Sequence, residues 1–104
     1  MMIDIDRLAP MFRALGERSR LRILGELLDE PRHVGDLVRR TGLRQSLVSH
    51  HLKVLREAGL VVARRRGPFV FYELAGDAVR AMLAGTPGTV RSTVSTRTRS
   101  GGEG

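Results

Sequence analysis

Two helical patterns separated by the dipeptide Thr41-Gly42 constrain the fold of this chain more than any other feature. The first covers about residues 33–40, where three apolar residues recur at the spacing of one helix face: Val34, Leu37 and Val38. The second covers about residues 44–58 and ends at Gly59, a residue suited to the left-handed conformation that commonly follows a helix. Two short helices joined by so tight a break predict a helix-turn-helix unit.

Two more helices are expected before this unit. They are predicted over about residues 5–15 and 17–29. Pro10 fits the first of them if that helix begins near Asp6 or Arg7, because first-turn amides lack intrahelical partners anyway. The second helix has one apolar stripe with two further apolar residues beside it: Leu21, Leu24 and Leu28, bordered by Ile23 and Leu27.

A hairpin and a last helix are expected after the unit. Two short apolar runs, about 60–63 and 69–74, enclose the turn-type sequence Arg64–Pro68 and predict a β-hairpin. A last helix is predicted at about 76–84. The order helix, helix, helix, helix, hairpin, helix predicts a mostly α fold with a small β-hairpin wing, a winged helix-turn-helix. In that fold the second helix of the turn motif enters the major groove of DNA, and the wing lies beside it on the backbone.

The length of the chain suggests one small domain, which we expect over residues 1–84. Residues 85–104 are mainly Gly, Ser, Thr and Arg, so we expect a disordered basic tail. The lack of cysteine excludes disulfides and thiolate metal sites. The N-terminal residues lack the pattern of a signal peptide, and no apolar run approaches the roughly 18 residues of a membrane span. We therefore expect a cytoplasmic protein with no membrane partner.

The charge of the chain indicates a polyanionic partner. The formal net charge is +7 in 104 residues, and Lys53 is the only lysine among 18 basic residues. Arginine can bind phosphate or guanine through two parallel hydrogen bonds. This composition favours double-stranded DNA as the partner.

The helix at about 44–58 has one face suited to reading DNA. On a helical wheel, Val48, Leu52 and Leu55 share one side, with Leu47 at its edge, while the polar residues gather elsewhere: Ser46, Ser49, His50 and Lys53. Gln45 lies at the N-terminal end, where a recognition helix commonly touches base edges. An ordinary solvated face would carry mixed charge, whereas this one is uncharged or positive, which favours DNA contact.

The adjacent histidines His50 and His51 do not predict a metal site or an active site. Neighbouring residues on a helix point about 100° apart, whereas helical metal pairs use a spacing of three or four residues. His51 falls nearer the apolar side, where we expect it to pack at the helix edge. Ser49 and His50 have no carboxylate arranged to orient the imidazole, so we expect no enzymatic activity.

Three stretches together resemble the ArsR-type family of bacterial winged-helix repressors. They are LGERSRLRILGELL, VGDLVRRTGLRQSLVSHHLKVLREAGLV and RRRGPFVFYEL, and the likeness covers roughly residues 8–74. The resemblance implies a homodimer that binds an inverted-repeat operator and releases it when an effector binds. It implies DNA reading by Gln45, Ser46, Ser49 and His50, with an arginine-rich wing at about 61–74. It also implies pairing through the first and last helices, whose apolar residues are Ile5, Leu8, Phe12, Val79, Met82 and Leu83.

The chain departs from the family pattern in two places. Arg44 stands where a small polar residue is common, so a helix N-cap worth about 1 kcal/mol is lost unless the helix begins at Thr41 or Gly42 instead. In exchange, we expect the arginine to add a phosphate contact. Arsenic- and cadmium-responsive members carry a cysteine pair before the Asp-Leu of the third helix, where this chain has His33-Val34-Gly35. The last helix offers only Asp77 in place of the usual Asp and His ligands. We therefore expect neither a metal nor a cofactor. The existence and chemistry of an effector stay open.

The wing and the tail add further arginines. Arg64, Arg65 and Arg66 precede Gly67-Pro68, and because strand residues alternate, two of the three are expected to reach the same phosphate backbone. In the tail, Arg91, Arg97 and Arg99 leave three roles open, namely non-specific DNA binding, binding to something else, and none. Two other functions also stay open: a non-specific architectural DNA-binding protein, and a regulator that acts through protein partners.

Overall fold

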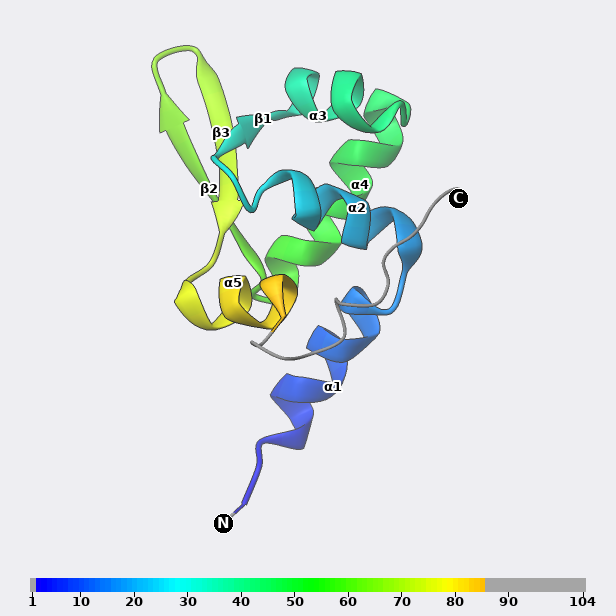
Figure 1. Cartoon of the computed structure of the whole chain (residues 1–104), viewed down its shortest axis with the longest axis vertical. Helices are drawn as coiled ribbons and strands as arrows, with labels where there is room; N and C mark the ends of the chain where they lie inside the picture. The colour runs from blue at the N-terminus through cyan, green and yellow to red at the C-terminus, as the bar shows by residue number, and fades with distance from the viewer. Residues whose placement is uncertain (1, 86–104) are drawn as a thin grey trace.

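The computed structural model describes residues 2–85 as five helices and a three-stranded sheet, which confirms the winged helix-turn-helix (Figure 1). The elements follow the expected order with one additional short strand, β1: α1 Ile5–Leu15, α2 Arg18–Glu26, β1 Arg32–His33, α3 Val34–Thr41, α4 Gln45–Glu57, β2 Val61–Arg66, β3 Phe69–Leu74 and α5 Asp77–Ala84. Within the described residues, no helix is both long and apolar enough to cross a membrane. The predicted tail lies, apart from Gly85, outside this range.

One hydrophobic core joins the helices to the base of the wing. Its fully buried side chains come from α2 and its C-cap, α3, α4, and the start of β2 with the residue before it: Ile23, Leu24, Leu27, Leu37, Val48, Leu52, Leu55, Leu60 and Val61. Removing each such Leu or Ile side chain from water contributes about 1.5–3 kcal/mol. The inward face of α2 differs from the predicted stripe, because Leu21 is 45% exposed while Ile23 and Leu27 are fully buried.

Helix α1 begins slightly earlier than Pro10 suggests. The Asp4 side chain caps it by accepting a hydrogen bond from the Arg7 amide at 3.2 Å, so the helix starts at Ile5 and Pro10 lies inside it. Proline has no amide hydrogen to donate to the carbonyl of Asp6. The helix continues because Asp6 and Pro10 are both exposed, which leaves that carbonyl open to water.

The sheet differs from the sequence-based expectation at the arginine triplet. β2 and β3 are antiparallel and are joined by Gly67-Pro68 alone, with a positive φ of 60° at Gly67 that suits the first position of a tight hairpin turn. Arg64, Arg65 and Arg66 therefore belong to β2, and their predicted place in the turn was wrong. Strand pairing uses backbone groups, so an exposed strand can carry charged side chains. The short β1 pairs with β3 on the other edge, in the order β1-β3-β2.

Candidate nucleic-acid interface

The turn between α3 and α4 is held by hydrogen bonds from both sides. The Thr41 hydroxyl donates to the Leu37 carbonyl at 2.7 Å and accepts from the Leu43 amide at 3.2 Å. Gly42 takes the left-handed conformation at φ 75°, and the Arg22 guanidinium donates to the Thr41 carbonyl at 2.7 Å. These contacts fix the angle at which α4 leaves the turn, as a recognition helix requires.

Helix α4 buries one side and leaves the predicted reading face exposed. Val48, Leu52 and Leu55 are in the core, and Gly59 closes the helix at φ 79°. The polar residues of the predicted face are all exposed to solvent: Gln45, Ser46, Ser49, His50 and Lys53. Arg44 occupies the N-cap position without a side-chain cap, as its sequence position suggested, and is exposed as well. The free amides of the first turn and this arginine together suit a phosphate group.

The two histidines have opposite surroundings, as the wheel predicted. His50 is exposed, whereas only 5% of His51 is accessible. The Nδ1 atom of His51 lies 3.4 Å from a guanidinium nitrogen of Arg20, and its Nε2 lies 4.0 Å from a carboxylate oxygen of Glu17. Burial lowers the pKa of His51 below its ordinary value, with a smaller opposing effect from Glu17. His51 therefore packs as a neutral side chain between α4 and the start of α2.

The three wing arginines differ in their partners. The register places Arg64 and Arg66 on one face of the hairpin and Arg65 on the other, and all three are exposed. Arg64 donates from Nε to a Glu73 carboxylate oxygen at 2.6 Å, so its charge is already matched. Arg66 lies over the Phe71 ring, 5.5 Å from its centroid. Arg65 has no ion-pair partner among residues 2–85.

Sequence reasoning missed an aromatic cluster at the edge of the wing. The His33 ring stacks on Phe69 with centroids 5.4 Å apart and meets Phe71 edge-on at 5.5 Å. The Nδ1 atom of His33 also accepts a hydrogen bond from the Asp36 amide at 3.3 Å, so His33 caps α3. The alternation of Phe69 and Phe71 in FVFY would have placed both rings on one face, but the pairing of β1 that brings in His33 has no sequence signal.

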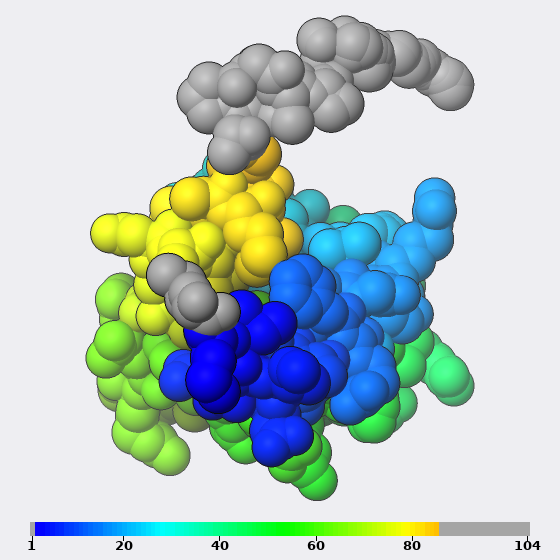
Figure 2. Space-filling view, turned by 90° about the horizontal axis from the view of Figure 1, so that it is seen from below, coloured from blue at the N-terminus to red at the C-terminus, as the bar shows by residue number. Residues whose placement is uncertain are grey.

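The apolar residues expected at a dimer interface are not equally available. Figure 2 shows α1 and α5 next to each other on one face of the molecule. Ile5 and Phe12 are 65% and 61% exposed, and Met82 is 44% exposed. Leu8 and Leu83 are half-buried, whereas Val79 is buried in the core of its own chain. Three of the six residues therefore offer substantial apolar surface to a partner.

Comparisons with known proteins agree with this architecture. NmtR, an HTH-type transcriptional regulator of Mycobacterium tuberculosis, is 43% identical over 77 residues, which cover 74% of this chain and 64% of NmtR. The transcriptional activator HlyU of Vibrio cholerae is 42% identical over 73 residues, covering 70% of this chain and 68% of HlyU. The homodimeric winged helix-turn-helix domain of Mb0332 from Mycobacterium bovis superposes with a TM-score of 0.74 at 35% identity, covering 77% of this chain and 74% of that one.

The same comparisons decide the class of protein. These relatives are named as transcriptional regulators, a non-enzymatic DNA-binding class, which confirms that the chain is not an enzyme. Residues 17–62, from the N-cap of α2 to the start of β2, match the family described as "Bacterial regulatory protein, arsR family". The chain therefore belongs to the ArsR family of bacterial winged helix-turn-helix transcriptional regulators.

Proposed function

We propose that the protein is a homodimeric transcriptional repressor that reads an inverted-repeat DNA operator with one α4 from each protomer. The observation that carries the proposal is the face of α4, where five polar, non-acidic side chains are exposed beside a buried apolar stripe. Four of these side chains have established partners on DNA, since Gln can pair with adenine, Ser with several bases, and Lys with guanine or phosphate. The residues proposed to touch DNA on this helix are Arg44, Gln45, Ser46, Ser49, His50 and Lys53.

The wing is proposed to hold the DNA backbone beside the reading helix. Arg65 and Arg66, one on each face of the hairpin, are the leading contacts, because Arg64 is engaged by Glu73. The homodimer is supported by the exposed apolar side chains of α1 and α5 and by the similar Mb0332 domain, whose structure is described as homodimeric. We assign both roles to residues 1–84, with residues 85–104 as a basic tail. This function would be carried out in the cytoplasm, where bacterial DNA lies.

We propose that the repressor does not use a metal ion as its effector. The chain has no cysteine, and within residues 2–85 no three His, Asp or Glu side chains gather closely enough to hold a metal. His33, at the position of the family's thiol ligands, is occupied with the α3 cap and the Phe69 ring. Operator affinity should therefore be the same with and without added zinc, nickel or cadmium ions.

Specific binding is tested with DNA from upstream of the protein's own gene and a shuffled fragment of equal length. We expect at least 1,000-fold tighter binding to the former, within the usual ratio for specific regulators. Affinity should also fall steeply with salt, as contacts to about six or more phosphates require. Equal affinity for both fragments would indicate an architectural protein, and absent binding would favour a regulator that acts through protein partners. Transcription from the same promoter, with and without the protein, separates repression from activation.

A further inference from the structure

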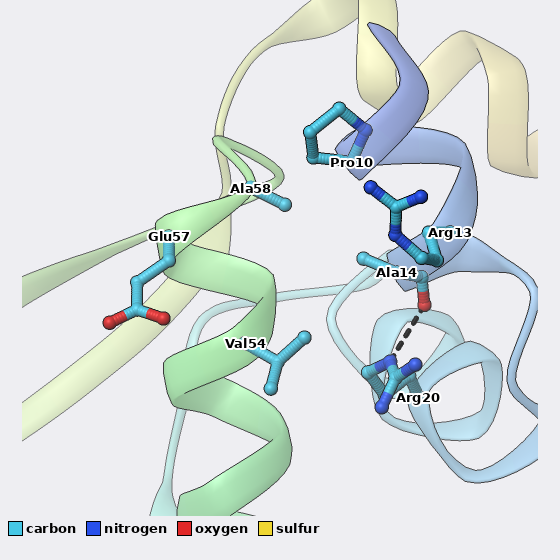
Figure 3. Close-up of a pocket in the computed structure, with 7 residues that line it drawn as sticks. All are labelled: Pro10, Arg13, Ala14, Arg20, Val54, Glu57 and Ala58. Atoms are coloured by element: carbon cyan, nitrogen blue, oxygen red, sulfur yellow. Dashed lines mark hydrogen bonds between the residues drawn. The ribbon is translucent and has the colours of Figure 1, made fainter. Parts of the chain in front are cut away.

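A pocket of about 380 Å³ lies between α1, α2 and α4 (Figure 3). Its volume falls in the range of small-molecule sites. Four apolar side chains line part of it: Pro10 and Ala14 from α1, with Val54 and Ala58 from α4 and its C-terminal cap. Ile5 and Phe12, the exposed apolar side chains of α1 proposed for the dimer interface, do not line it.

The polar part of the pocket is positively charged. Arg13 of α1 and Arg20 of α2 line it, and Glu57 of α4 is the acidic side chain at its rim. Figure 3 shows the Glu57 carboxylate pointing away from both guanidinium groups. Within the described part of the chain, neither Arg13 nor Arg20 forms an ion pair with a carboxylate at 4.0 Å or less. Glu17, which accepts a hydrogen bond from the Arg20 amide at 2.9 Å, does not line the pocket. Two arginines that are not ion-paired and one glutamate that points away from them therefore line an otherwise apolar pocket.

Arg20 is held in position yet keeps hydrogen-bond donors free. Its Nε donates to the Ala14 carbonyl at 2.7 Å, and one terminal nitrogen lies 3.4 Å from Nδ1 of His51. A guanidinium has five N–H donors, so the remaining ones can bind an acceptor in the pocket. A carboxylate matches this planar group with two parallel hydrogen bonds, which makes it a better fit than an uncharged oxygen.

We propose that this pocket binds a small organic monocarboxylate. Arg13 and Arg20 hold the carboxylate, and Pro10, Ala14, Val54 and Ala58 enclose a short aliphatic or aromatic body. The apolar residues exclude a bare inorganic anion as the preferred ligand, because such an anion would leave their surface in water. The binding itself does not depend on the proposed function.

The pocket also connects binding to the reading helix. A ligand there would contact α1, α2 and α4 together, and Arg20 already touches His51 on the inner side of α4. Because α1 is the proposed dimer helix, a change between α1 and α4 alters the spacing of the two reading helices. We infer that the carboxylate is an effector that changes operator affinity, a step that rests on the proposed repressor function.

Binding is measured on the full chain by calorimetry with hexanoate and benzoate, and with hexanamide and inorganic phosphate for comparison. We expect saturable binding of at least one carboxylate with a Kd of about 1 mM or tighter. Hexanamide and phosphate should each bind at least about tenfold more weakly, because hexanamide lacks the negative charge and phosphate lacks the apolar body. Failure of both carboxylates to saturate, or equal binding of the amide or of phosphate, would overturn the proposal.

Substitutions locate the site. Arg13→Gln should weaken carboxylate binding at least about tenfold, since charged hydrogen bonds contribute strongly, and Arg13→Lys should restore part of it. Arg7→Gln makes the same change on the same helix outside the pocket, so it should bind like the wild type. Both positions are exposed, so folding should be unaffected. Equal affinity of the Arg13→Gln and Arg7→Gln variants would place the ligand elsewhere and contradict the proposed site.

The regulatory step has its own measurement. In the wild type, saturating carboxylate should change operator affinity at least about threefold, which corresponds to a modest allosteric coupling. In the Arg13→Gln variant, the same carboxylate concentration should leave operator affinity constant. Carboxylate binding without any such change would overturn the effector role but leave the site intact. Carboxylate binding by a chain that fails to bind operator DNA at all would overturn the proposed function and not the pocket.

Discussion

Two neighbouring histidines of α4 belong to different parts of the molecule. His50 projects from the exposed face with Ser46 and Ser49, whereas His51 is enclosed between α4 and α2. Adjacent helix positions diverge by about 100°, so a helix that packs on one side separates them in this way. The two histidines therefore do not form a single site: His50 belongs to the exposed surface and His51 to the packed interior.

Alanine substitutions should separate these two roles. His50→Ala should weaken operator binding about tenfold or more by removing a contact to a base edge or phosphate, with stability changed by less than about 0.5 kcal/mol. His51→Ala should instead destabilise the fold by about 1–2 kcal/mol, since it empties a buried position. Fluorescence anisotropy and urea unfolding measure the two effects. If His50→Ala destabilised the fold and His51→Ala weakened operator binding, the DNA-reading face of α4 would be wrongly assigned by one residue.

The surroundings of His51 also predict how stability depends on pH. Because burial lowers its pKa in the folded state, the unfolded chain binds more protons than the folded one as the pH falls below about 6.5. The stabilisation from neutral His51 is thus complete above that pH and is lost as the pH falls toward the folded-state pKa. Unfolding free energy should decline between pH 7.5 and 5.5 in the wild type, and less so in His51→Asn. Glu17 does not obscure the result, since its pKa is lowered from 4.5 and its effect lies below this window.

At the scale of elements, the wing has fewer arginines available for phosphate than its sequence suggests. Strand alternation predicts that two of the three arginines reach the same phosphate backbone. In the hairpin, Arg64 shares a face with Arg66 but its side chain is ion-paired with Glu73, and Arg65 lies on the opposite face. An exposed ion pair contributes little to stability, yet it reduces the positive charge that a phosphate can meet. We therefore expect unequal contributions to DNA binding from neighbouring residues of one strand.

The salt dependence of DNA binding measures this difference between Arg65 and Arg64. In a dimer, Arg65→Ala removes one phosphate contact from each protomer, so the slope of log affinity against log salt should fall by about 2. Arg64→Ala is the matched control on the same strand, and its slope should fall by less than about 1 because Glu73 already neutralises that charge. A larger effect from Arg64 than from Arg65 would show that the ion pair opens on DNA.

Periodicity predicted the faces of α4 but not those of α2. Helix α4 confines its large apolar residues mainly to one side, so Val48, Leu52 and Leu55 could be placed correctly from spacing alone. In α2 the apolar residues extend around more of the helix, and only packing against α1, α3 and α4 selects Ile23 over Leu21. The strand β1 and the pocket beneath α1 depend on residues distant in sequence, which no local pattern brings together.

At the scale of the whole molecule, one protomer presents one reading helix. Half-sites of an inverted repeat lie about 34–36 Å apart, so two such helices must be held at a fixed spacing by a dimer. The described residues provide a candidate surface for this, since α1 and α5 lie next to each other on one face (Figure 2), and Phe12 of α1 and Met82 of α5 are exposed. Dimer formation and operator binding should therefore be lost together.

A charge placed on the face formed by α1 and α5 tests whether operator binding depends on dimer formation. Phe12→Glu and Met82→Glu should each shift the protein to a folded monomer at micromolar concentration, because an unpaired carboxylate in an apolar interface is costly to desolvate. Operator affinity should then fall at least about 100-fold, as the second half-site no longer adds to the first. Phe69→Glu is the control, since Phe69 is 53% exposed but lies on the wing, and this variant should remain dimeric. Sedimentation equilibrium gives the oligomeric state and circular dichroism the fold, and a folded, dimeric Phe12→Glu protein would contradict the proposed interface.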